Sequence, residues 1–234
     1  MQRSMYISAQ AANIAKQRLS ILSNNIANTN TVGFKKDNIV VSIDNTYGFN
    51  NNKNGKLSTD FSQGRLRFTG DNLHIAIDGS GFFKVKLKDG SVGYTRRSIF
   101  RINNQKQLVT DKGYQLMGSG GPIAVESSDI SLDEKGNIYD SKDNNLGKIQ
   151  LFDFEDPDAL DKIGGSVFID SNANAGEIES ESTVKQGYLE ESNVDSVGEM
   201  LAMMDSLRNY ETGQRVIQYF DQTLGKVINE LGKG

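Results

Sequence analysis

Residues 5–26 read MYISAQAANIAKQRLSILSNNI, and the spacing of their apolar side chains decides the N-terminal element. Small and aliphatic residues recur at alternating intervals of three and four, the period of a helix that buries one stripe against a partner helix. The stripe consists of Met5, Ser8, Ala12, Ala15, Leu19, Leu22 and Ile26, with Ser8 as its only polar member. It predicts a helix of about 25 residues, roughly 38 Å long at 1.5 Å per residue.

The C-terminal segment repeats this pattern over about residues 195–231. Its apolar ladder comprises Met200, Met203, Leu207, Tyr210, Gln214, Ile217, Asp221, Leu224, Ile228 and Leu231. Three glycines inside it, Gly198, Gly213 and Gly225, each cost a helix roughly 1 kcal/mol relative to alanine. An isolated helix with this composition is marginal, so the segment is expected to need a partner. Either Asn193 or Asp195 is a suitable N-cap.

Between the two ends the apolar period shortens toward two, which is typical of strands. Short alternating runs are expected as strands at residues 73–77, 82–87, 93–95 and 99–102. Turn signals separate the runs: Asp78-Gly79, Asp89-Gly90, Lys112-Gly113 and Lys135-Gly136-Asn137. Their spacing favours an antiparallel β-rich domain over βαβ units.

The sequence therefore predicts an α+β chain whose terminal helices pair as a coiled-coil-like layer beside a central antiparallel β-domain. The expected parts are an N-terminal helix and signature (1–34), an Asn-rich connecting loop (35–60), a β-rich core (61–190) and a C-terminal helix (191–234). Both helices carry a second apolar stripe, which indicates packing against other subunits. A closed helical hairpin packed on its own β-domain is the alternative.

Composition excludes several classes of protein. The chain has 234 residues, no Cys and one His, so disulfides, thiolate sites and multi-histidine metal sites are excluded. The formal net charge of −4 argues against a nucleic-acid binder. No apolar run is long enough to span a bilayer, and the first residues lack the apolar core of a secretory signal.

Motifs for chemistry are weak. Gly79-Ser80-Gly81 is a lone GxG that a tight turn explains, and His74 has no nucleophile beside it in the pattern. The acidic cluster after residue 128 lacks the spacing of a calcium loop and is expected to be a solvated hairpin. Arg96-Arg97 is expected to be a basic strand end or an inter-subunit ion pair. We predict no catalytic, cofactor-binding or metal residues, no cofactor, and no enzymatic activity.

Three blocks carry a resemblance to a known family. LSNNIANTNTVGFK (22–35) resembles the N-terminal signature of bacterial flagellar rod and hook proteins. Residues 68–96 resemble the β-domain motif of that family, and residues 186–211 resemble its C-terminal motif. Two positions depart from the family pattern, His74 in place of Asp and Ser98 in place of Gly.

The resemblance implies a structural subunit of the flagellar basal-body rod, the shaft that carries motor torque across the periplasm. It implies self-assembly through the terminal helices and export by the flagellar type III apparatus without a cleaved signal. The implied partners are other copies, other rod proteins, the export apparatus and ring components, with no nucleic acid or small-molecule substrate. Residues 152–168 look more like those of a proximal than of a distal rod subunit.

Two groups of residues are the candidates for this function. The predicted assembly interface consists of Leu19, Leu22, Ile26, Met203, Leu207, Tyr210, Ile217 and Leu224. The predicted helix-exit anchor consists of Asn28, Gly33 and Phe34. Asparagine and threonine side chains after Ile26 bond freed backbone groups, Gly33 permits positive φ, and Phe34 anchors the departing chain.

Three alternatives remain at this stage. The distal rod subunit is the nearest, because it belongs to the same family. A secreted, adhesin-like β-protein leaves the paired terminal stripes unexplained. An enzyme acting on peptidoglycan would need a catalytic carboxylate pair, for which the sequence offers no convincing candidate.

Overall fold

The computed structural model describes residues 2–40, 56–164, 166–171 and 173–231. They form two compact units. A helical unit comprises Met1–Ala27, Asp37–Ser58 and Asp195–Gly234, and a β unit comprises Asn28–Lys36 and Thr59–Val194. The chain thus enters and leaves the β unit more than once, and segments far apart in sequence share each unit.

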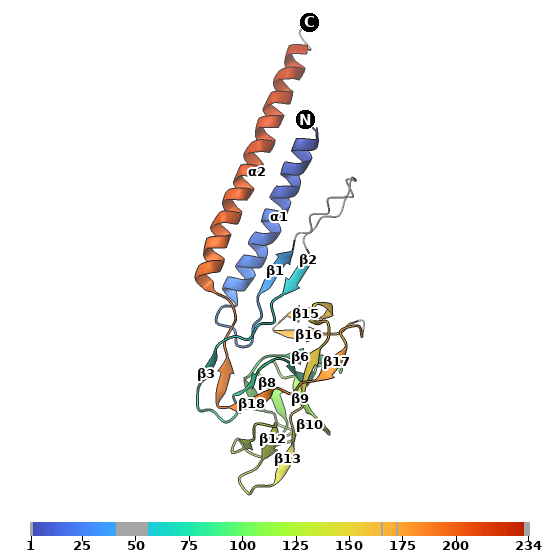
Figure 1. Cartoon of the computed structure of the whole chain (residues 1–234), viewed down its shortest axis with the longest axis vertical. Coiled ribbons are helices and arrows are strands. Elements are labelled where there is room, and N and C mark those ends of the chain that lie inside the picture. The colour runs from blue at the N-terminus through green and yellow to red at the C-terminus, as the bar shows by residue number, and fades with distance from the viewer. Residues whose placement is uncertain (1, 41–55, 165, 172, 232–234) are drawn as a thin grey trace. The chain divides into compact units, whose positions relative to one another are not determined.

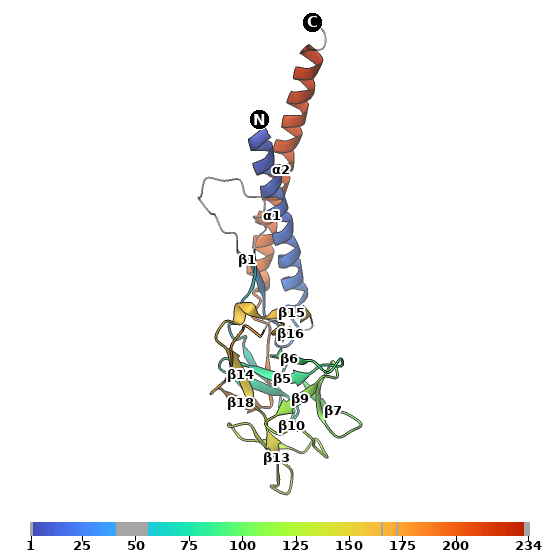
Figure 2. The same cartoon turned by 90° about the vertical axis from the view of Figure 1, so that its right-hand side faces the viewer.

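The helical unit is built on α1 (Gln2–Ala27) and α2 (Ser196–Leu231), which pack side by side and antiparallel in both views (Figures 1 and 2). The predicted stripe of α1 is the packed one: Ala12, Ala15 and Leu22 are buried, and Ala12 approaches Gly213 of α2. Both helices and their pairing were therefore correctly expected. The supercoiled geometry of a coiled coil stays a prediction.

A short two-stranded sheet completes this unit. It pairs β1 (Asp37–Val40) with β2 (Lys56–Thr59), and β1 contacts α1. Strands therefore occupy both ends of the segment expected to be a connecting loop. The expectation rested on the Asn-rich residues 44–60, of which 44–55 lie outside the described residues.

Short strands fill the β unit, with one 3-10 turn at Pro157–Ala159. They are β3 (Leu66–Phe68), β4 (Ile75–Asp78), β5 (Phe82–Lys86), β6 (Val92–Thr95), β7 (Phe100–Ile102), β8 (Leu108–Thr110), β9 (Gln115–Gly118), β10 (Gly121–Pro122), β11 (Ser131–Leu132), β12 (Asn137–Tyr139), β13 (Asn145–Lys148), β14 (Leu151–Phe154), β15 (Asp161–Gly164), β16 (Val167–Ile169), β17 (Glu177–Glu179), β18 (Thr183–Gln186) and β19 (Tyr188–Glu190). The four strands expected from the alternating runs correspond to β4, β5, β6 and β7.

The largest sheet runs in the order β15-β16-β6-β5-β9-β8-β7, with β10, β14 and β17 attached off this path. Separate small sheets pair β18 with β4, β19 with β3, and β11, β12 and β13 with one another. The pairings among β3 to β19 are antiparallel. The central antiparallel β-domain is therefore confirmed.

Its core has two parts. In the first part, aliphatic residues from many strands surround the edge-to-face rings of Phe83 and Phe100. In the second, Phe82 packs edge to face on Phe168, and Tyr94 does so on Phe154. Edge-to-face rings place the positive ring edge against a negative ring face. This aromatic cluster lies next to the segment that carries the site described below, because Arg96 approaches the ring of Phe82.

One turn type recurs at the hairpins. Asn103, Asp133 and Asp140 each accept hydrogen bonds from the backbone N–H groups two and four residues later. The residue three positions after each of them has positive φ: Lys106, Gly136 and Asp143. The expected turn at Lys135-Gly136-Asn137 is thus a side-chain-closed hairpin.

Neither helix in the described part of the chain is long and apolar enough to cross a membrane.

Candidate functional site

The chain leaves α1 through a tight turn at Asn28–Gly33. The Thr31 hydroxyl donates to the Asn28 side-chain oxygen at 3.1 Å, and the Thr31 N–H donates to the Asn28 carbonyl at 3.0 Å. Gly33 has a φ of +67°, and a Cβ at this position would collide with the Arg96 carbonyl oxygen. Only glycine fits here, because both the backbone angle and the available space exclude a side chain.

The next residue, Phe34, is buried in the β unit, with only 4% of its surface exposed. The ammonium group of Lys162 lies 4.1 Å from the centre of its ring and donates to the Lys35 carbonyl at 2.7 Å. A cation over a ring is worth about 0.5–2 kcal/mol, depending on its desolvation. The three predicted anchor residues therefore lie in one turn, whose end is packed into the β unit.

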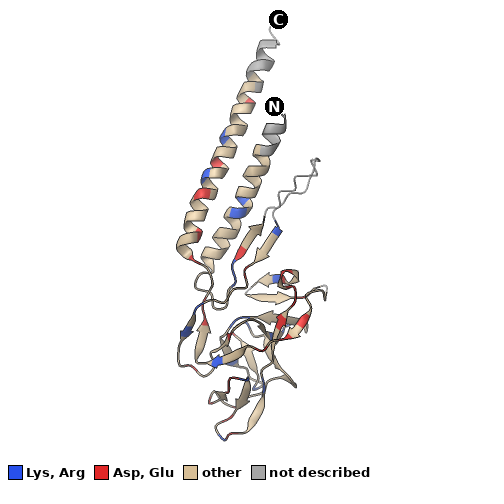
Figure 3. Ribbon diagram, in the orientation of Figure 1, with Lys and Arg blue, Asp and Glu red and all other residues tan. Residues whose placement is uncertain are grey.

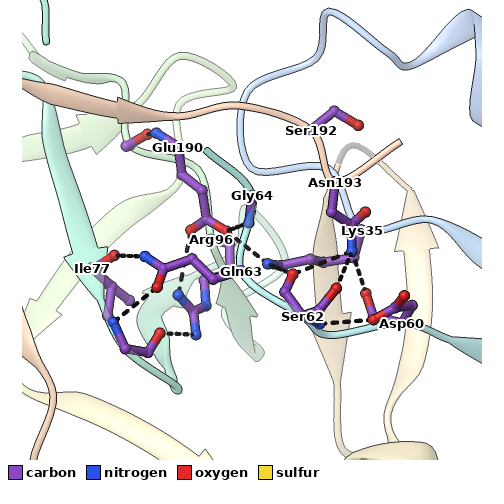
Figure 4. A network of polar contacts seen from close by, with 12 residues as sticks. Lys35, Asp60, Ser62, Gln63, Gly64, Ile77, Arg96, Glu190, Ser192 and Asn193 are labelled. Carbon is purple, nitrogen blue, oxygen red and sulfur yellow. Dashed lines mark hydrogen bonds and ion pairs between the residues drawn. The ribbon is translucent and has the colours of Figure 1, made fainter. Parts of the chain in front are cut away.

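Lys35 forms a buried ion pair that sequence analysis missed. Its ammonium group donates to Glu190 Oε1 at 2.7 Å and to the Ser62 carbonyl at 2.6 Å (Figure 4). Arg96 Nη1 donates to the other oxygen of Glu190 at 3.3 Å, and the Gly64 N–H donates to Oε1 at 3.0 Å. Glu190 thus joins two cations inside the β unit.

Burial dominates the electrostatics of this triad. It lowers the pKa of Lys35 below its usual value of 10.5, and the Glu190 carboxylate opposes that shift. It likewise lowers the pKa of Arg96, again against Glu190. Removing the shared Glu190 carboxylate would leave two buried cations without a counter-charge, which costs about 3–5 kcal/mol.

Arg96 and Arg97 directly follow β6, so the expected basic strand end is present. Both are buried and pair within the chain, Arg96 with Glu190 and Arg97 with Asp111. The sequence did not indicate these pairs, because adjacent basic residues give no sign of which acids at other positions will neutralise them.

Asn193 and Ser98 hold the segment that leads back to α2 by hydrogen bonds. The Asn193 side chain accepts from the Lys36 N–H at 2.8 Å and donates to the Asp60 carbonyl at 2.8 Å. The buried Ser98 hydroxyl accepts from the Glu190 N–H at 2.9 Å. Since Asn193 is engaged here, Asp195 caps α2 by accepting from the Val197 N–H at 3.2 Å. The open choice of N-cap is thereby decided.

Asn25 is the corresponding polar residue of the helical unit. It is fully buried, exchanges hydrogen bonds with both backbone groups of Asp37 at 2.9 and 3.0 Å, and donates to Glu199 of α2 at 3.0 Å. One amide therefore joins α1, β1 and α2. The apolar pattern did not predict the burial of Asn25, because a polar residue between two apolar stripes of a helix is expected to be exposed.

The predicted assembly residues divide into two environments. Leu22 is buried, and Leu19, Ile26, Met203, Tyr210 and Ile217 are half-buried. Leu207 remains 48% exposed, and the side chain of Leu224 lies outside the described part. Most of the predicted residues thus contribute to packing within the helical unit.

α2 also bears an unpartnered apolar ridge, composed of Val197, Met200, Leu201, Met204 and Leu207. Each of these side chains is about half or more exposed. Charge is distributed unevenly over the helices: the described part of α1 has bases and no acid, whereas α2 carries both (Figure 3). An exposed apolar patch such as the α2 ridge is typical of a protein interaction site.

The remaining chemical candidates have structural roles. Thr69 Oγ1 lies 2.8 Å from Nδ1 of His74, and Gly79 and Gly81 adopt positive φ in a turn. In the described residues, no group of His, Asp and Glu is arranged to hold a metal ion.

Comparison with known proteins places each part of the chain. Residues 5–35 match the family model "Flagella basal body rod protein", residues 76–185 match "Flagellar hook protein FlgE/F/G D1 domain", and residues 185–231 match "Flagellar basal body rod FlgEFG protein C-terminal". The flagellar basal-body rod protein FlgG of Bacillus subtilis is 31% identical over 98% of this chain and 99% of its own. This chain belongs to the flagellar rod and hook protein family.

Other members of the family match over their full length. FlgG of Borreliella burgdorferi is 29% identical over 99% of both chains, and FlgF of Caulobacter vibrioides is 27% identical over 100% of this chain and 99% of its own. The predicted family and the predicted non-enzymatic, structural role are confirmed. The relatives carry both the FlgG and the FlgF name, so the family alone does not assign a position within the rod.

The buried triad has a simple relation to the family models. Lys35 lies in the N-terminal match, Arg96 in the D1-domain match, and Glu190 in the C-terminal match. In this rod-family chain the three separately matched regions therefore meet at one carboxylate.

Proposed function

We propose that this chain is a structural subunit of the rod that polymerises through its helical unit and transmits torque through its β unit. The α2 ridge carries the proposal, because five apolar side chains on one helix remain exposed after α1 has packed. Burying these apolar side chains between subunits would stabilise the association by about 25 cal/mol per Å² of apolar surface removed from water. The family membership and the relatives named as basal-body rod proteins support the same assignment.

The connections between the helices and the β unit are suited to a subunit that transmits torque. The segments leading to and from the helices, residues 28–36 and 190–194, are joined to each other by the Lys35–Glu190 pair and by the bond from Lys36 to Asn193. Packed interiors resist deformation. A twist applied to either segment therefore meets a desolvated ion pair and a buried ring rather than a free linker.

Within the rod we propose a proximal position, the one favoured by residues 152–168. The alignment with FlgF of Caulobacter vibrioides extends over 250 positions and that with FlgG of Bacillus subtilis over 263, so this chain of 234 residues needs fewer gap positions against FlgF. A distal position is the second candidate, because the relatives of higher identity are named FlgG. The remaining proposed partners are the export apparatus and ring components, with the rod located in the periplasm and no cleaved export signal.

Cryo-electron tomography of basal bodies in a clean deletion strain tests these positions. A rod that ends close to the inner membrane supports the proximal assignment. A truncated rod of substantial length supports the distal one. A complete rod and hook would refute the structural role altogether.

A further inference from the structure

The stripe that α2 turns toward α1 differs from the apolar ladder of the sequence. Met203, Tyr210 and Ile217 belong to that ladder and are half-buried. Met200 and Leu207 belong to it as well, yet these side chains remain 52% and 48% exposed. Packing against α1 therefore follows only part of the pattern that predicted α2.

Polar and small residues take the places of the exposed ladder residues. The residues that directly precede them are Glu199, which is half-buried, and Ser206, which is only 2% exposed. Seven residues after Ser206, Gly213 lies beside α1, at a point where a Cβ would be 3.3 Å from that of Ala12. Because the two stripes share half of their members and neighbouring residues are about 100° apart, their centres differ by roughly 50° around α2.

The observed rotation leaves the more apolar side of α2 outward. Turning α2 by that angle would bring Met200 and Leu207 against α1 and would move Glu199 and Ser206 to the flank. Apolar contacts are non-directional and strengthen with the area removed from water, so by themselves they favour burial of the methionine and the leucine. A directional contact must therefore hold the observed rotation.

Asn25 of α1 supplies such a contact. Its side chain is fully buried, and its nitrogen donates to Glu199 Oε2 at 3.0 Å and to the Asp37 carbonyl at 2.9 Å. Its oxygen accepts from the Asp37 N–H at 3.0 Å. An amide nitrogen carries two hydrogens, so Asp37 and Glu199 use both of them. A turned α2 would place Met200 beside the amide and leave one buried N–H without an acceptor, which is unfavourable.

We infer that Asn25 is a positioning residue that fixes the rotation of α2 about its own axis, so that Glu199 rather than Met200 faces α1. The Asn25 amide thereby keeps Met200 and Leu207 of the α2 ridge outward, instead of letting them pack on α1 of the same chain. All the groups involved lie in one molecule. The purified full-length chain therefore suffices for the test, and the outcome does not depend on the proposed function.

Two single cysteines report the rotation, since the chain has no cysteine of its own. Ser206→Cys places a thiol on the inward stripe, and Leu207→Cys places one on the exposed side. In the otherwise unchanged chain, a maleimide should label Leu207→Cys at least about tenfold faster than Ser206→Cys, because a buried thiol reacts only when the structure opens locally. Adding Asn25→Leu should slow the labelling of Leu207→Cys and speed that of Ser206→Cys, which brings the ratio of the two rates to about one.

Opposite changes at neighbouring positions identify a rotation, because loosening of the helix pair would speed the labelling of both thiols. Asn24→Leu is the matched control, since Asn24 is the exposed neighbour of Asn25, and it should leave both rates unchanged. Glu199→Gln keeps an acceptor for the Asn25 amide and should also preserve both rates. Glu199→Ala removes the acceptor and should change the rates as Asn25→Leu does.

Other outcomes overturn the inference. Labelling rates in Asn25→Leu that match those of the unchanged chain would show that apolar packing alone sets the rotation. Faster labelling at both positions, with less helix by circular dichroism, would show that Asn25 only stabilises the helix pair. If Asn25→Leu does not fold, Glu199→Ala decides the matter, and rates equal to those of Glu199→Gln contradict the role of Asn25.

Discussion

Lys35 and Glu190 form a fully buried ion pair, with Nζ 2.7 Å from Oε1, although 155 positions separate them in the sequence. Glu190 also pairs with Arg96, so one carboxylate faces two cations. This unequal ratio has a measurable consequence. Loss of the carboxylate leaves two like charges in a desolvated site, whereas loss of Lys35 leaves a balanced pair.

Glu190→Gln should therefore destabilise the protein by about 3–5 kcal/mol, and Lys35→Met by clearly less. Urea denaturation of both variants measures the difference. Glu191→Gln is the matched control, because Glu191 is half-exposed and pairs with the exposed Arg67, so it should change stability by about 1 kcal/mol at most. Equal losses of unfolding free energy in Glu190→Gln and Lys35→Met would show that Arg96 does not need the Glu190 carboxylate to balance its charge.

Gly33→Ala should prevent the turn after α1 from forming. The substitution combines a positive φ with a collision against the Arg96 backbone, so we expect a loss of more than about 2 kcal/mol. Gly90→Ala isolates the first effect, since Gly90 has a φ of +88° and no neighbour within 4 Å of an added Cβ. It should cost only about 1 kcal/mol. Thermal unfolding of the two variants provides the comparison.

Leu22→Asp and Leu207→Asp should fail for different reasons. Leu22 is buried, so a carboxylate there breaks the helix pair and lowers helix content. Leu207 is 48% exposed, so Leu207→Asp should keep the stability of the purified chain within about 0.5 kcal/mol while abolishing motility. Circular dichroism and swimming assays separate the two cases. A motile Leu207→Asp strain argues against the ridge as an assembly surface.

The turn at Asp133 should be sensitive to acid. Hydrogen bonds from Asn137 hold the pKa of the Asp133 carboxyl below its usual 3.8. A depressed folded pKa contributes stability above pH 3.8 that is lost as the pH falls through the folded value. In Asn137→Ala the carboxyl should titrate at higher pH than in the wild type. NMR titration of the Asp133 side chain measures this, and an unchanged midpoint would assign the shift to another group.

Lys106→Gly should stabilise the protein. Lys106 holds a φ of +58° in the same hairpin geometry that Gly136 serves without strain. Relief of that strain is worth up to about 1 kcal/mol, partly offset by the greater freedom of the unfolded chain. Its exposed pair with Glu126 contributes little. A higher midpoint of thermal unfolding is expected, and a lower one would show that the turn prefers the lysine.

Local patterns in the sequence determined the elements of this protein. The stripe through Leu22 and the ladder through Leu207 were sufficient to predict α1 and α2, because helical periodicity depends only on residues close to one another in the sequence. Turn residues such as Gly136 did the same for the hairpins. The resemblance of residues 22–35 to rod proteins identified the family, since that block is contiguous. The prediction of proximal or distal position stays open, because both kinds of subunit share these patterns.

Only the tertiary structure decided which distant residues meet. Nothing near Lys35 indicates that its partner is Glu190, or that Arg96 shares it, because burial and charge pairing depend on the whole fold. Asn25 gave no periodic signal, yet its amide joins α1, β1 and α2. The ladder of α2 reads as one continuous stripe in the sequence, yet Met203 is half-buried whereas Met200 and Leu207 of the same ladder remain about half exposed. Periodicity follows from neighbouring residues, whereas pairing and exposure follow from the arrangement of the complete chain.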